Sequence, residues 1–241
     1  MLTESENEVI GILSDAHGNH AAFILGWQIL SGLGATRFVY LGDAVGYIPS
    51  ADVITSLMEM GDKVLCIKGN HELMLLSAHY PSCQESCYRL QKTAELLSVE
   101  EKSFVSSWPE QLRARFSAGS CLFLHGSPHH STNGYIYPDT DLSKFKPRSN
   151  FVFMGHSHRP FIRRNNDSVY VNVGSCGLPR DDGRYGSIAL FDPAEGDVRL
   201  LRYDISSAIE KFLSGLFDVH PSVIEIFQRR SKSMQGDIIE F

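Results

Sequence analysis

Side chains that bind metals recur in this sequence at the ends of short apolar runs. Five runs of strand-like length are each followed within a few residues by Asp, Asn or His. The residues delivered in this way are Asp15, His17, Asp43, Asn70, His71, His125, His156 and His158. Carboxylate, amide and imidazole groups without a thiolate suit Mn²⁺, Fe or Zn²⁺ better than a Ca²⁺ cage. The sequence therefore predicts a site for transition-type metal ions.

The predicted ligand set is larger than a single metal ion needs. A catalytic metal typically takes about three protein ligands, whereas two Asp, one Asn and four His are available after His71 is set aside. Two cations ~3.5–4 Å apart that share one carboxylate would use all of them. Such pairs serve phosphatases and nucleases, in which they activate water and polarise a phosphoryl group. Hydrolysis of phosphoric esters is therefore one reaction that such a site would suit.

The elements that must position these residues follow a strand–helix–strand order. Apolar runs predict strands at 9–13, 37–41 and 64–67, and the stretches 20–33 and 51–60 between them predict helices. This alternation indicates a largely parallel sheet. Ligands of open α/β sheets bind beyond the carboxyl ends of the strands. The side chains that follow the strands are therefore expected to converge.

The remainder of the chain predicts helices, then two more strands of this kind, then an antiparallel part. Residues 72–115 read as helical, and a capping box is expected at Ser98 and Glu101. Further strands are predicted at 121–124, 151–154, 168–173, 187–191 and 198–203. The segment 129–149 lacks periodicity, and a loop of that length in a compact domain is usually functional or disordered.

Length and spacing predict one large domain with a small appendage. We expect a domain over residues 1–205 and a helical appendage over 206–241, in a chain of 241 residues. The apolar positions of the appendage recur at helical spacing: Ile209, Phe212, Leu213, Leu216 and Phe217. Dimerisation and packing on the domain are both open as its role.

Composition indicates a soluble globular protein. The chain is 43% hydrophobic and 21% charged, and its first eight residues are acidic and polar, unlike a signal peptide. We expect a cytoplasmic protein with reduced cysteines and no membrane contact. A net charge of −6 argues against bulk nucleic-acid binding. The expected partner is a small phosphorylated substrate, with a nucleotide as one option, and a homo-oligomer is left open.

The strand-end motifs resemble, in order, the five blocks of the calcineurin-like metallophosphoesterase superfamily. The blocks are Asp15-x-His17, Gly42-Asp43-x-x-Gly46, Gly69-Asn70-His71-Glu72, His125-Gly126 and Gly155-His156-x-His158. The resemblance spans roughly residues 9–204, and segments 124–128 and 172–180 look like the small bacterial and archaeal phosphodiesterase-like branch. It implies an α/β fold, a four-layer α/β sandwich of two mixed β-sheets flanked by helices, with a short helical C-terminal tail.

The resemblance also implies a role for each residue of the site. One metal would be held by Asp15, His17, Asp43 and His158. Asp43 would bridge to the second metal, whose other ligands would be Asn70, His125 and His156. His71 would lie next to the substrate and not on a metal. Two divalent ions are implied, with Mn²⁺ expected first and Fe, Zn²⁺, Ni²⁺ or Mg²⁺ as alternatives.

The expected reaction is hydrolysis of a phosphodiester or phosphomonoester by attack of a metal-bridging hydroxide. His71 is expected to be the general acid that protonates the leaving alkoxide, because the ordinary histidine pKa of ~6.5 permits a proton near neutrality. Gly69 is expected to allow the sharp exit from the strand, and Glu72 to be a carboxylate at a helix start and not a ligand.

Residues that contact the substrate are harder to assign from sequence. Asn19 and Arg180 are candidate phosphate contacts, with helix capping as the alternative for Asn19 and a solvated charge as the alternative for Arg180. His129, His130, Tyr135 and Tyr137 could form a lid that stacks on a base, or could simply pack on the surface.

Other functions remain as alternatives. Serine/threonine protein phosphatases share Gly-Asn-His-Glu, but their second block typically runs Gly-Asp-x-x-Asp-Arg-Gly, and that Asp and Arg are missing here. A dinucleotide polyphosphatase stays open, and so does a nuclease, which the negative net charge disfavours. A non-catalytic scaffold of the same fold is disfavoured because such relatives have lost ligands or the catalytic histidine. A phosphocysteine mechanism is disfavoured because only three residues separate Cys176 from Arg180, where the tyrosine-phosphatase loop has five.

Overall fold

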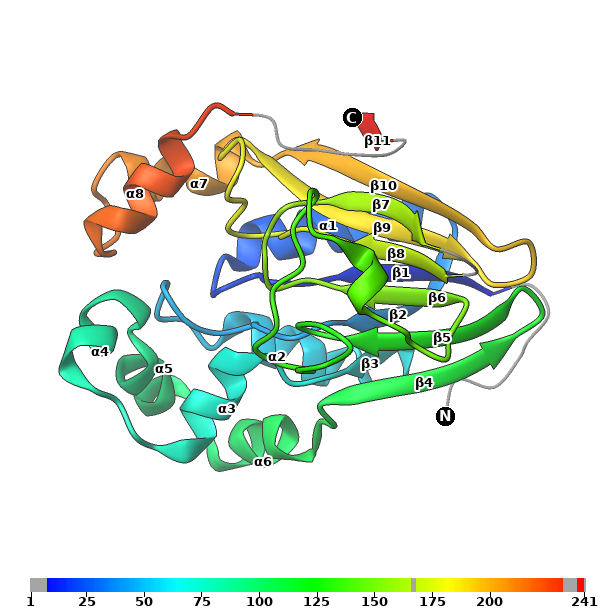
Figure 1. Cartoon of the computed structure of the whole chain (residues 1–241). Helices are drawn as coiled ribbons and strands as arrows, with labels where there is room; N and C mark the ends of the chain where they lie inside the picture. The colour runs from blue at the N-terminus through cyan, green and yellow to red at the C-terminus, as the bar shows by residue number, and fades with distance from the viewer. Residues whose placement is uncertain (1–7, 166–167, 232–237, 241) are drawn as a thin grey trace.

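The computed structural model describes residues 8–165, 168–231 and 238–240 (Figure 1). The chain opens with a regular alternation of strands and helices: β1 (Val9–Leu13), α1 (His20–Gly32), β2 (Ala35–Tyr40), α2 (Asp52–Glu59) and β3 (Val64–Cys66). A helical region follows, made of α3 (Asn70–Ser77), α4 (Ser82–Tyr88), α5 (Leu90–Leu96) and α6 (Val99–Ser107). The predicted opening of the fold is confirmed.

The second half of the described chain consists mainly of strands. These are β4 (Gln111–Phe116), β5 (Gly119–Leu124), β6 (Phe151–Met154), β7 (Phe161–Asn165), β8 (Ser168–Asn172), β9 (Tyr185–Asp192) and β10 (Asp197–Asp204). The C-terminal part adds α7 (Ser206–Leu213), α8 (Pro221–Gln228) and β11 (Ile238–Glu240). Two short 3₁₀ helices lie at Gly61–Lys63 and Leu142–Lys144. None of the helices within the described ranges has the length and apolar character that crossing a membrane requires.

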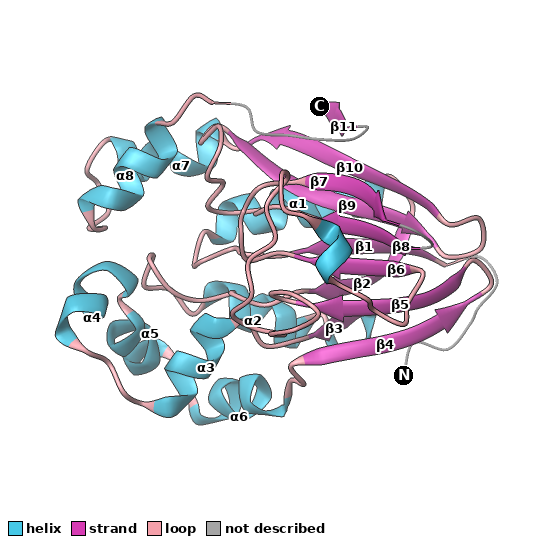
Figure 2. Ribbon diagram, viewed as in Figure 1, coloured by secondary structure: helices cyan, strands magenta, loops and turns pink. Residues whose placement is uncertain are grey.

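The strands form two mixed sheets that face each other (Figure 2). The first has the order β11-β10-β9-β1-β2-β3, with β1, β2 and β3 parallel and β9 antiparallel to β1. The second has the order β4-β5-β6-β8-β7, with β5, β6 and β8 parallel. The predicted α/β fold with two mixed sheets is confirmed.

Three apolar layers hold the fold together. One lies between the two sheets and includes Ile12, Phe123 and Phe153. A larger one joins the first sheet to the helices and includes Phe23 and Phe212. The outer face of the second sheet is covered by the segment 126–150, which contributes Ile136, Leu142 and Phe145 to the third layer.

The structure corrects the sequence prediction at β4 and β7. Residues 111–115 were expected to be helical, but Gln111–Phe116 is a strand that pairs with β5. Its exposed and inward residues alternate, which is the period of a strand with one buried face. β7 was not expected at all. The predicted antiparallel part is divided between the sheets, because β9 and β10 extend the sheet of β1, whereas β8 joins β6 in parallel.

The C-terminal part is helical over α7 and α8 and then forms a strand. β11 pairs in parallel with the edge of β10. Residues 238–240 were expected to be helical, and that prediction is wrong. Phe212 of α7 and Phe227 of α8 share the apolar layer of α1. Residues 232–237 and 241 of the expected appendage lie outside the described residues, and the boundary at residue 205 stays a prediction.

Candidate metal centre

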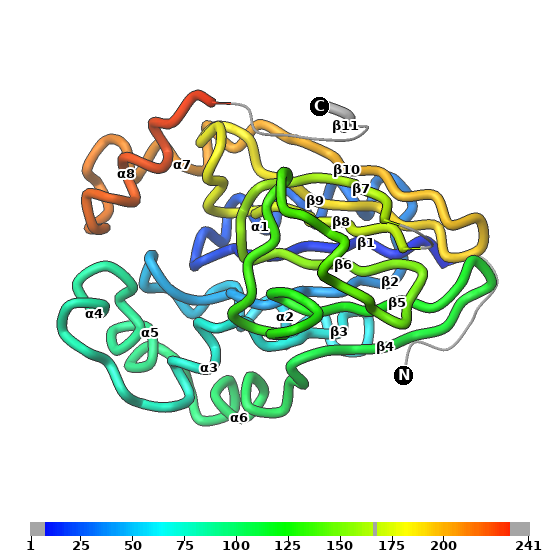
Figure 3. The backbone as a smooth tube through the Cα atoms, in the orientation of Figure 1, coloured from blue at the N-terminus to red at the C-terminus, as the bar shows by residue number. Residues whose placement is uncertain are grey.

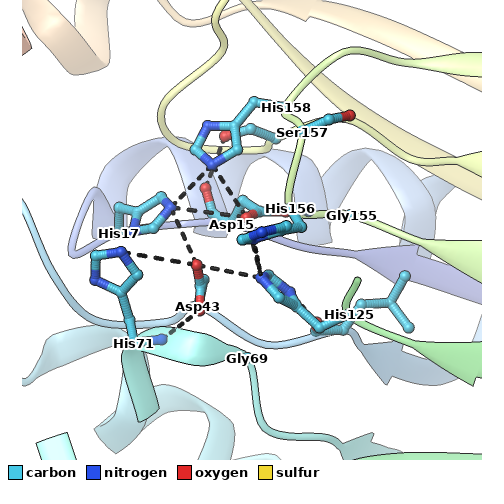
Figure 4. A network of polar contacts seen from close by, with 12 residues as sticks. Asp15, His17, Asp43, Gly69, His71, His125, Gly155, His156, Ser157 and His158 are labelled. Atoms are coloured by element: carbon cyan, nitrogen blue, oxygen red, sulfur yellow. Dashed lines mark hydrogen bonds and ion pairs between the residues drawn. The ribbon is translucent and has the colours of Figure 1, made fainter. Parts of the chain in front are cut away.

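The predicted site residues come from loops that meet at one end of both sheets, next to the helical groups α3–α6 and α7–α8 (Figure 3). Asp15 and His17 follow β1, and Asp43 follows β2. His125 follows β5, and His156 and His158 follow β6, while Asn70 and His71 begin α3. Figure 4 shows that the Asp and His side chains from these loops point toward one another. The expected convergence is confirmed.

One group of potential ligands contains Asp15, His17 and His158. His158 Nε2 lies 3.1 Å from Asp15 Oδ1 and 3.1 Å from His17 Nε2 (Figure 4). His17 Nε2 lies 3.7 Å from the same Asp15 oxygen. One carboxylate oxygen and two imidazole nitrogens therefore face a common point.

A second group contains Asp43, His125 and His156, and a third, made of His17, Asp43 and His71, shares one residue with each of the other two. His125 Nε2 lies 3.2 Å from Asp43 Oδ2 and 3.1 Å from His156 Nδ1. The same Asp43 oxygen is 3.7 Å from His17 Nε2, so this carboxylate lies between the two groups (Figure 4). Asp43 thus occupies the place that a bridging ligand requires.

Two buried oxygens in the site have no hydrogen-bond partner among the described residues. They are Asp15 Oδ1 and Asn70 Oδ1. A buried polar atom without a partner typically costs about 1–3 kcal/mol, so both oxygens are suited to accept a ligand. The mixed O/N donor set and these two oxygens fit divalent metal ions. The ligand role of Asn70 stays a prediction.

Backbone carbonyls orient three of the four predicted histidine ligands. The Nδ1 atoms of His17, His125 and His158 lie within hydrogen-bond distance of the carbonyls of Val45, Leu41 and Leu178. A carbonyl can only accept, so each Nδ1 carries the proton and donates it. When the imidazole is neutral, Nε2 keeps a free lone pair directed into the site, as in known metal-binding histidines.

The loops hold most of these residues in the left-handed backbone region. The φ angles are positive for five predicted ligands: Asp15 (58°), His17 (48°), Asp43 (56°), His156 (62°) and His158 (55°). Such a conformation costs roughly 1–3 kcal/mol for each residue other than glycine, and it clusters at functional sites. The surroundings therefore fix these side chains at an energetic cost.

Glu72 binds the loop that carries Asp43. Its carboxylate accepts from the backbone N–H groups of Gly69 and Asp43 (2.8 and 2.7 Å), and of Ala44 and Val45 (2.8 and 3.4 Å). The prediction of a carboxylate at a helix start is confirmed, because Glu72 lies in the first turn of α3.

Gly69 is required for a reason that the sequence did not indicate. Its φ is −93° and its ψ is −175°, an extended conformation that other residues also adopt. A Cβ at this position would lie 2.1 Å from Asp43 Oδ1. The glycine therefore provides room for the central carboxylate, and the expected sharp exit from the strand is not its role.

Opposite charges dominate the electrostatics of the two groups. Burial raises the pKa of Asp15 and of Asp43, but the neighbouring histidines outweigh it and hold both pKa values well below the usual range. Burial lowers the pKa of His125, yet Asp43 and Asp15 raise it to about 10. The buried carboxylates of Asp15 and Asp43 therefore favour the binding of cations at this site.

His71 lies beside the central carboxylate. Its Nε2 is 4.0 Å from Asp43 Oδ2, and its backbone N–H donates to Asp43 Oδ1 (2.9 Å). Burial lowers the pKa of His71 to about 3, although Asp43 acts in the opposite direction. The premise that His71 keeps an ordinary pKa is therefore wrong for the protein before substrate binds, because its imidazole is then neutral near pH 7.

Two tyrosines that the sequence analysis did not select surround His71. The ring of Tyr47 stacks on that of His71 at 5.3 Å, and the ring of Tyr88 lies at 4.8 Å. Tyr47 lies in the same loop as Asp43, but no spacing rule distinguishes it. Tyr88, at the end of α4, reaches the site only through the folding of the helical region.

The two candidate substrate contacts, Arg180 and Asn19, lie in different surroundings. Arg180 donates from Nη2 to the Tyr47 hydroxyl (2.7 Å), and its buried Nε has no partner among the described residues. Asn19 is fully buried; its side chain accepts from Ala22 N and donates to the Gly177 carbonyl (2.9 Å). Helix capping therefore accounts for Asn19, and contact of either residue with substrate stays a prediction.

A family model described as the calcineurin-like phosphoesterase superfamily domain matches residues 9–196. Among known proteins, the uncharacterized protein MJ0912 of Methanocaldococcus jannaschii is 26% identical over 226 residues. That match covers 85% of this chain and 92% of the archaeal protein.

Solved structures share the fold at low sequence identity. The hypothetical protein PH1004 of Pyrococcus horikoshii OT3 is 19% identical with a TM-score of 0.77, covering 93% of this chain and 99% of that one. A metallophosphoesterase from Sphaerobacter thermophilus is 22% identical with a TM-score of 0.72, covering 92% and 98%. These similarities concern the fold alone.

Proposed function

Because this chain belongs to the calcineurin-like phosphoesterase superfamily, we propose that it is a binuclear metal-dependent phosphoesterase. Its reaction would be hydrolysis of a phosphodiester or phosphomonoester. The observation that carries the proposal is the position of Asp43 between two ligand groups, with one oxygen 3.2 Å from His125 Nε2 and 3.7 Å from His17 Nε2.

The proposed metal ligands follow the two groups. One cation would be held by Asp15, His17, Asp43 and His158, and the other by Asp43, Asn70, His125 and His156. When bound, the two cations would lower the pKa of a water molecule and polarise the phosphoryl group. A mixture of oxygen and imidazole nitrogen donors suits Mn²⁺, Fe or Zn²⁺, and of these we propose Mn²⁺ first.

His71 would assist the departure of the leaving group. In the chain itself its imidazole is neutral, and an anionic phosphoester beside it would raise its pKa and favour the protonated form. The proton would then pass from the imidazole to the leaving alkoxide. Tyr47 and Tyr88 fix the ring beside Asp43, so the donor needs little reorientation.

Arg180 would bind a phosphoryl oxygen. Tyr47 holds its guanidinium through Nη2, and other guanidinium N–H groups remain to donate to a phosphate. Protein phosphatases of this superfamily use an arginine in the second sequence block, which this chain lacks. Arg180 would supply a comparable charge from the loop between β8 and β9.

A substrate and metal panel tests the proposal. Phosphomonoesters, phosphodiesters, a dinucleoside polyphosphate and a phosphopeptide are offered to protein loaded with Mn²⁺, Fe²⁺, Zn²⁺, Ni²⁺ or Mg²⁺. We expect hydrolysis of small esters and loss of that activity in Asp43→Asn. Activity that survives in Asp43→Asn would refute the binuclear site. Preference for the polyphosphate or the phosphopeptide would favour those alternatives, and inactivity with two metals bound would favour a scaffold.

The choice of leaving group separates the role of His71 from metal binding. His71→Ala should slow hydrolysis of an alkyl ester by about 10²–10⁴-fold. It should slow a nitrophenyl ester much less, because nitrophenolate leaves without a proton. Metal content, measured by elemental analysis, should match the wild type. Loss of metal, or equal slowing of both esters, would contradict the general-acid role.

A further inference from the structure

Two parallel tyrosine rings are exposed beside the proposed metal centre. The ring centroid of Tyr135 lies 4.0 Å from that of His156. Tyr137 lies 5.7 Å from Tyr135, and the two ring planes differ by only 5°. The exposed fraction is 50% for Tyr135 and 40% for Tyr137. An exposed apolar surface of this kind, adjoining a ligand of the metal centre, suggests a binding role.

The surrounding chain fixes the backbone that carries both rings. Ile136, between the two tyrosines, is 1% exposed and packs into the apolar layer on the second sheet. The backbone N–H of Tyr137 donates to Thr140 Oγ1 (2.8 Å), and the Thr140 carbonyl accepts from Arg163 of β7. With Ile136 anchored inward, its neighbours stay on the outer side. A surface arranged in advance binds at a lower cost in entropy.

The rings adjoin the groups that would bind phosphate. His156, on which Tyr135 packs, belongs to the ligand group around Asp43. A phosphoester at the metal centre would therefore place its organic part within reach of Tyr135 and Tyr137.

We propose that Tyr135 and Tyr137 form a stacking platform for a flat aromatic group of the substrate, such as a nucleobase. This inference rests on the proposed phosphoesterase function and names its substrate class. Every nucleobase has a π-face, so stacking selects aromatic esters over alkyl esters without choosing among bases. The platform is uncharged, and the phosphate end is bound by Arg180 and the metal centre.

Paired probes that differ only in an aromatic group test the platform. Binding of the phosphonate analogues of AMP and of ribose 5-phosphate to Mn²⁺-loaded protein is measured by calorimetry, because their C–P bonds resist hydrolysis. The AMP analogue should bind roughly 5–150-fold more tightly, the range that base stacking supports. Tyr135→Leu and Tyr137→Leu should each reduce this ratio, whereas Tyr135→Phe should keep it. A second pair, phenylphosphonate and methylphosphonate, should show the same preference if any flat ring suffices.

The outcomes separate this inference from the proposed function. Equal affinity of the two nucleotide probes for the wild type, or a preference that survives both leucine variants, would overturn the platform, even with phosphoesterase activity present. A preference that both leucine variants abolish, in a protein that hydrolyses no ester, would refute the proposed function and leave the platform standing. Both tyrosines are substantially exposed, so the leucine variants should unfold at nearly the wild-type temperature, which thermal unfolding verifies.

Discussion

Replacement of Gly69 by alanine tests whether the central carboxylate is confined as tightly as the structure indicates. The new Cβ would lie 2.1 Å from Asp43 Oδ1 and 2.7 Å from Asp43 N. The oxygen would have to withdraw by about 1.3 Å to reach the 3.4 Å at which ordinary contact begins. A displacement of about 1 Å at a reacting centre can cost about 10²-fold in rate.

The expected stability change has two opposing parts. Alanine at a compatible backbone position stabilises a protein by about 0.4–1 kcal/mol, because the unfolded chain loses freedom. The φ of −93° at Gly69 is compatible. Overpacking at a confined position costs about 1–3 kcal/mol. We therefore expect Gly69→Ala to be destabilised by up to about 2.5 kcal/mol and to bind metal at least about 10-fold more weakly.

Gly32→Ala is the matched control for this prediction. Gly32 is the last residue of α1, and a Cβ there would meet no atom within 4 Å. The same chemical change should leave metal binding intact and raise stability slightly. Thermal unfolding and titration with Mn²⁺ measure both effects in both variants. If Gly69→Ala gains stability like Gly32→Ala and keeps its metal affinity, the confinement of Asp43 is refuted.

Three further predictions follow from neighbouring contacts. In Gly46→Ala the new Cβ would lie 2.1 Å from His71 Nδ1 and alanine would have to keep a φ of +97°. The kcat for an alkyl ester should therefore fall at least about 10-fold, and an unchanged kcat would contradict this. Asp181→Asn breaks the buried ion pair with Arg202 next to Arg180, and chemical denaturation should show a loss of about 3–5 kcal/mol; a loss under about 1 kcal/mol would show that the pair is not essential. Removal of metal by a chelator should lower the free energy of unfolding. The loss should be about 2.7 kcal/mol for each site, if the free metal concentration had been 100 times the Kd of that site. Unchanged thermal unfolding would argue against metal binding.

Local patterns were sufficient to predict the first part of the fold. β1, β2, β3, α1 and α2 all lie where apolar runs and glycine signals placed them, because each pattern is complete within a few residues. β4 was missed because it follows helices and its alternation is short. The pairing of β9 with β1 was missed because about 180 residues separate Ile10 from its partner Phe191, and no local signal specifies a partner at that range.

The site was predictable as a set of residues but not as an environment. Five motifs in order were enough to select the Asp and His residues that the structure brings together, whereas burial is a property of the folded molecule. The low pKa of His71 arises mainly from that burial, and the ordinary value was for that reason a poor guide. The rings of Tyr47 and Tyr88 were missed for the same reason, since each meets His71 only after the loop and α4 have folded together.

The loops of the site stabilise one another, which explains why the motifs are informative only together. The loop after β2 accepts from His17 through the Val45 carbonyl and from His125 through the Leu41 carbonyl. The loop that contains Leu178 accepts from His158. Each histidine is therefore oriented by a loop other than its own, and the left-handed conformations of the ligands depend on neighbours distant in sequence. A single block can occur by chance in an unrelated fold, but its ligand would then lack the partner loop that directs it into the site.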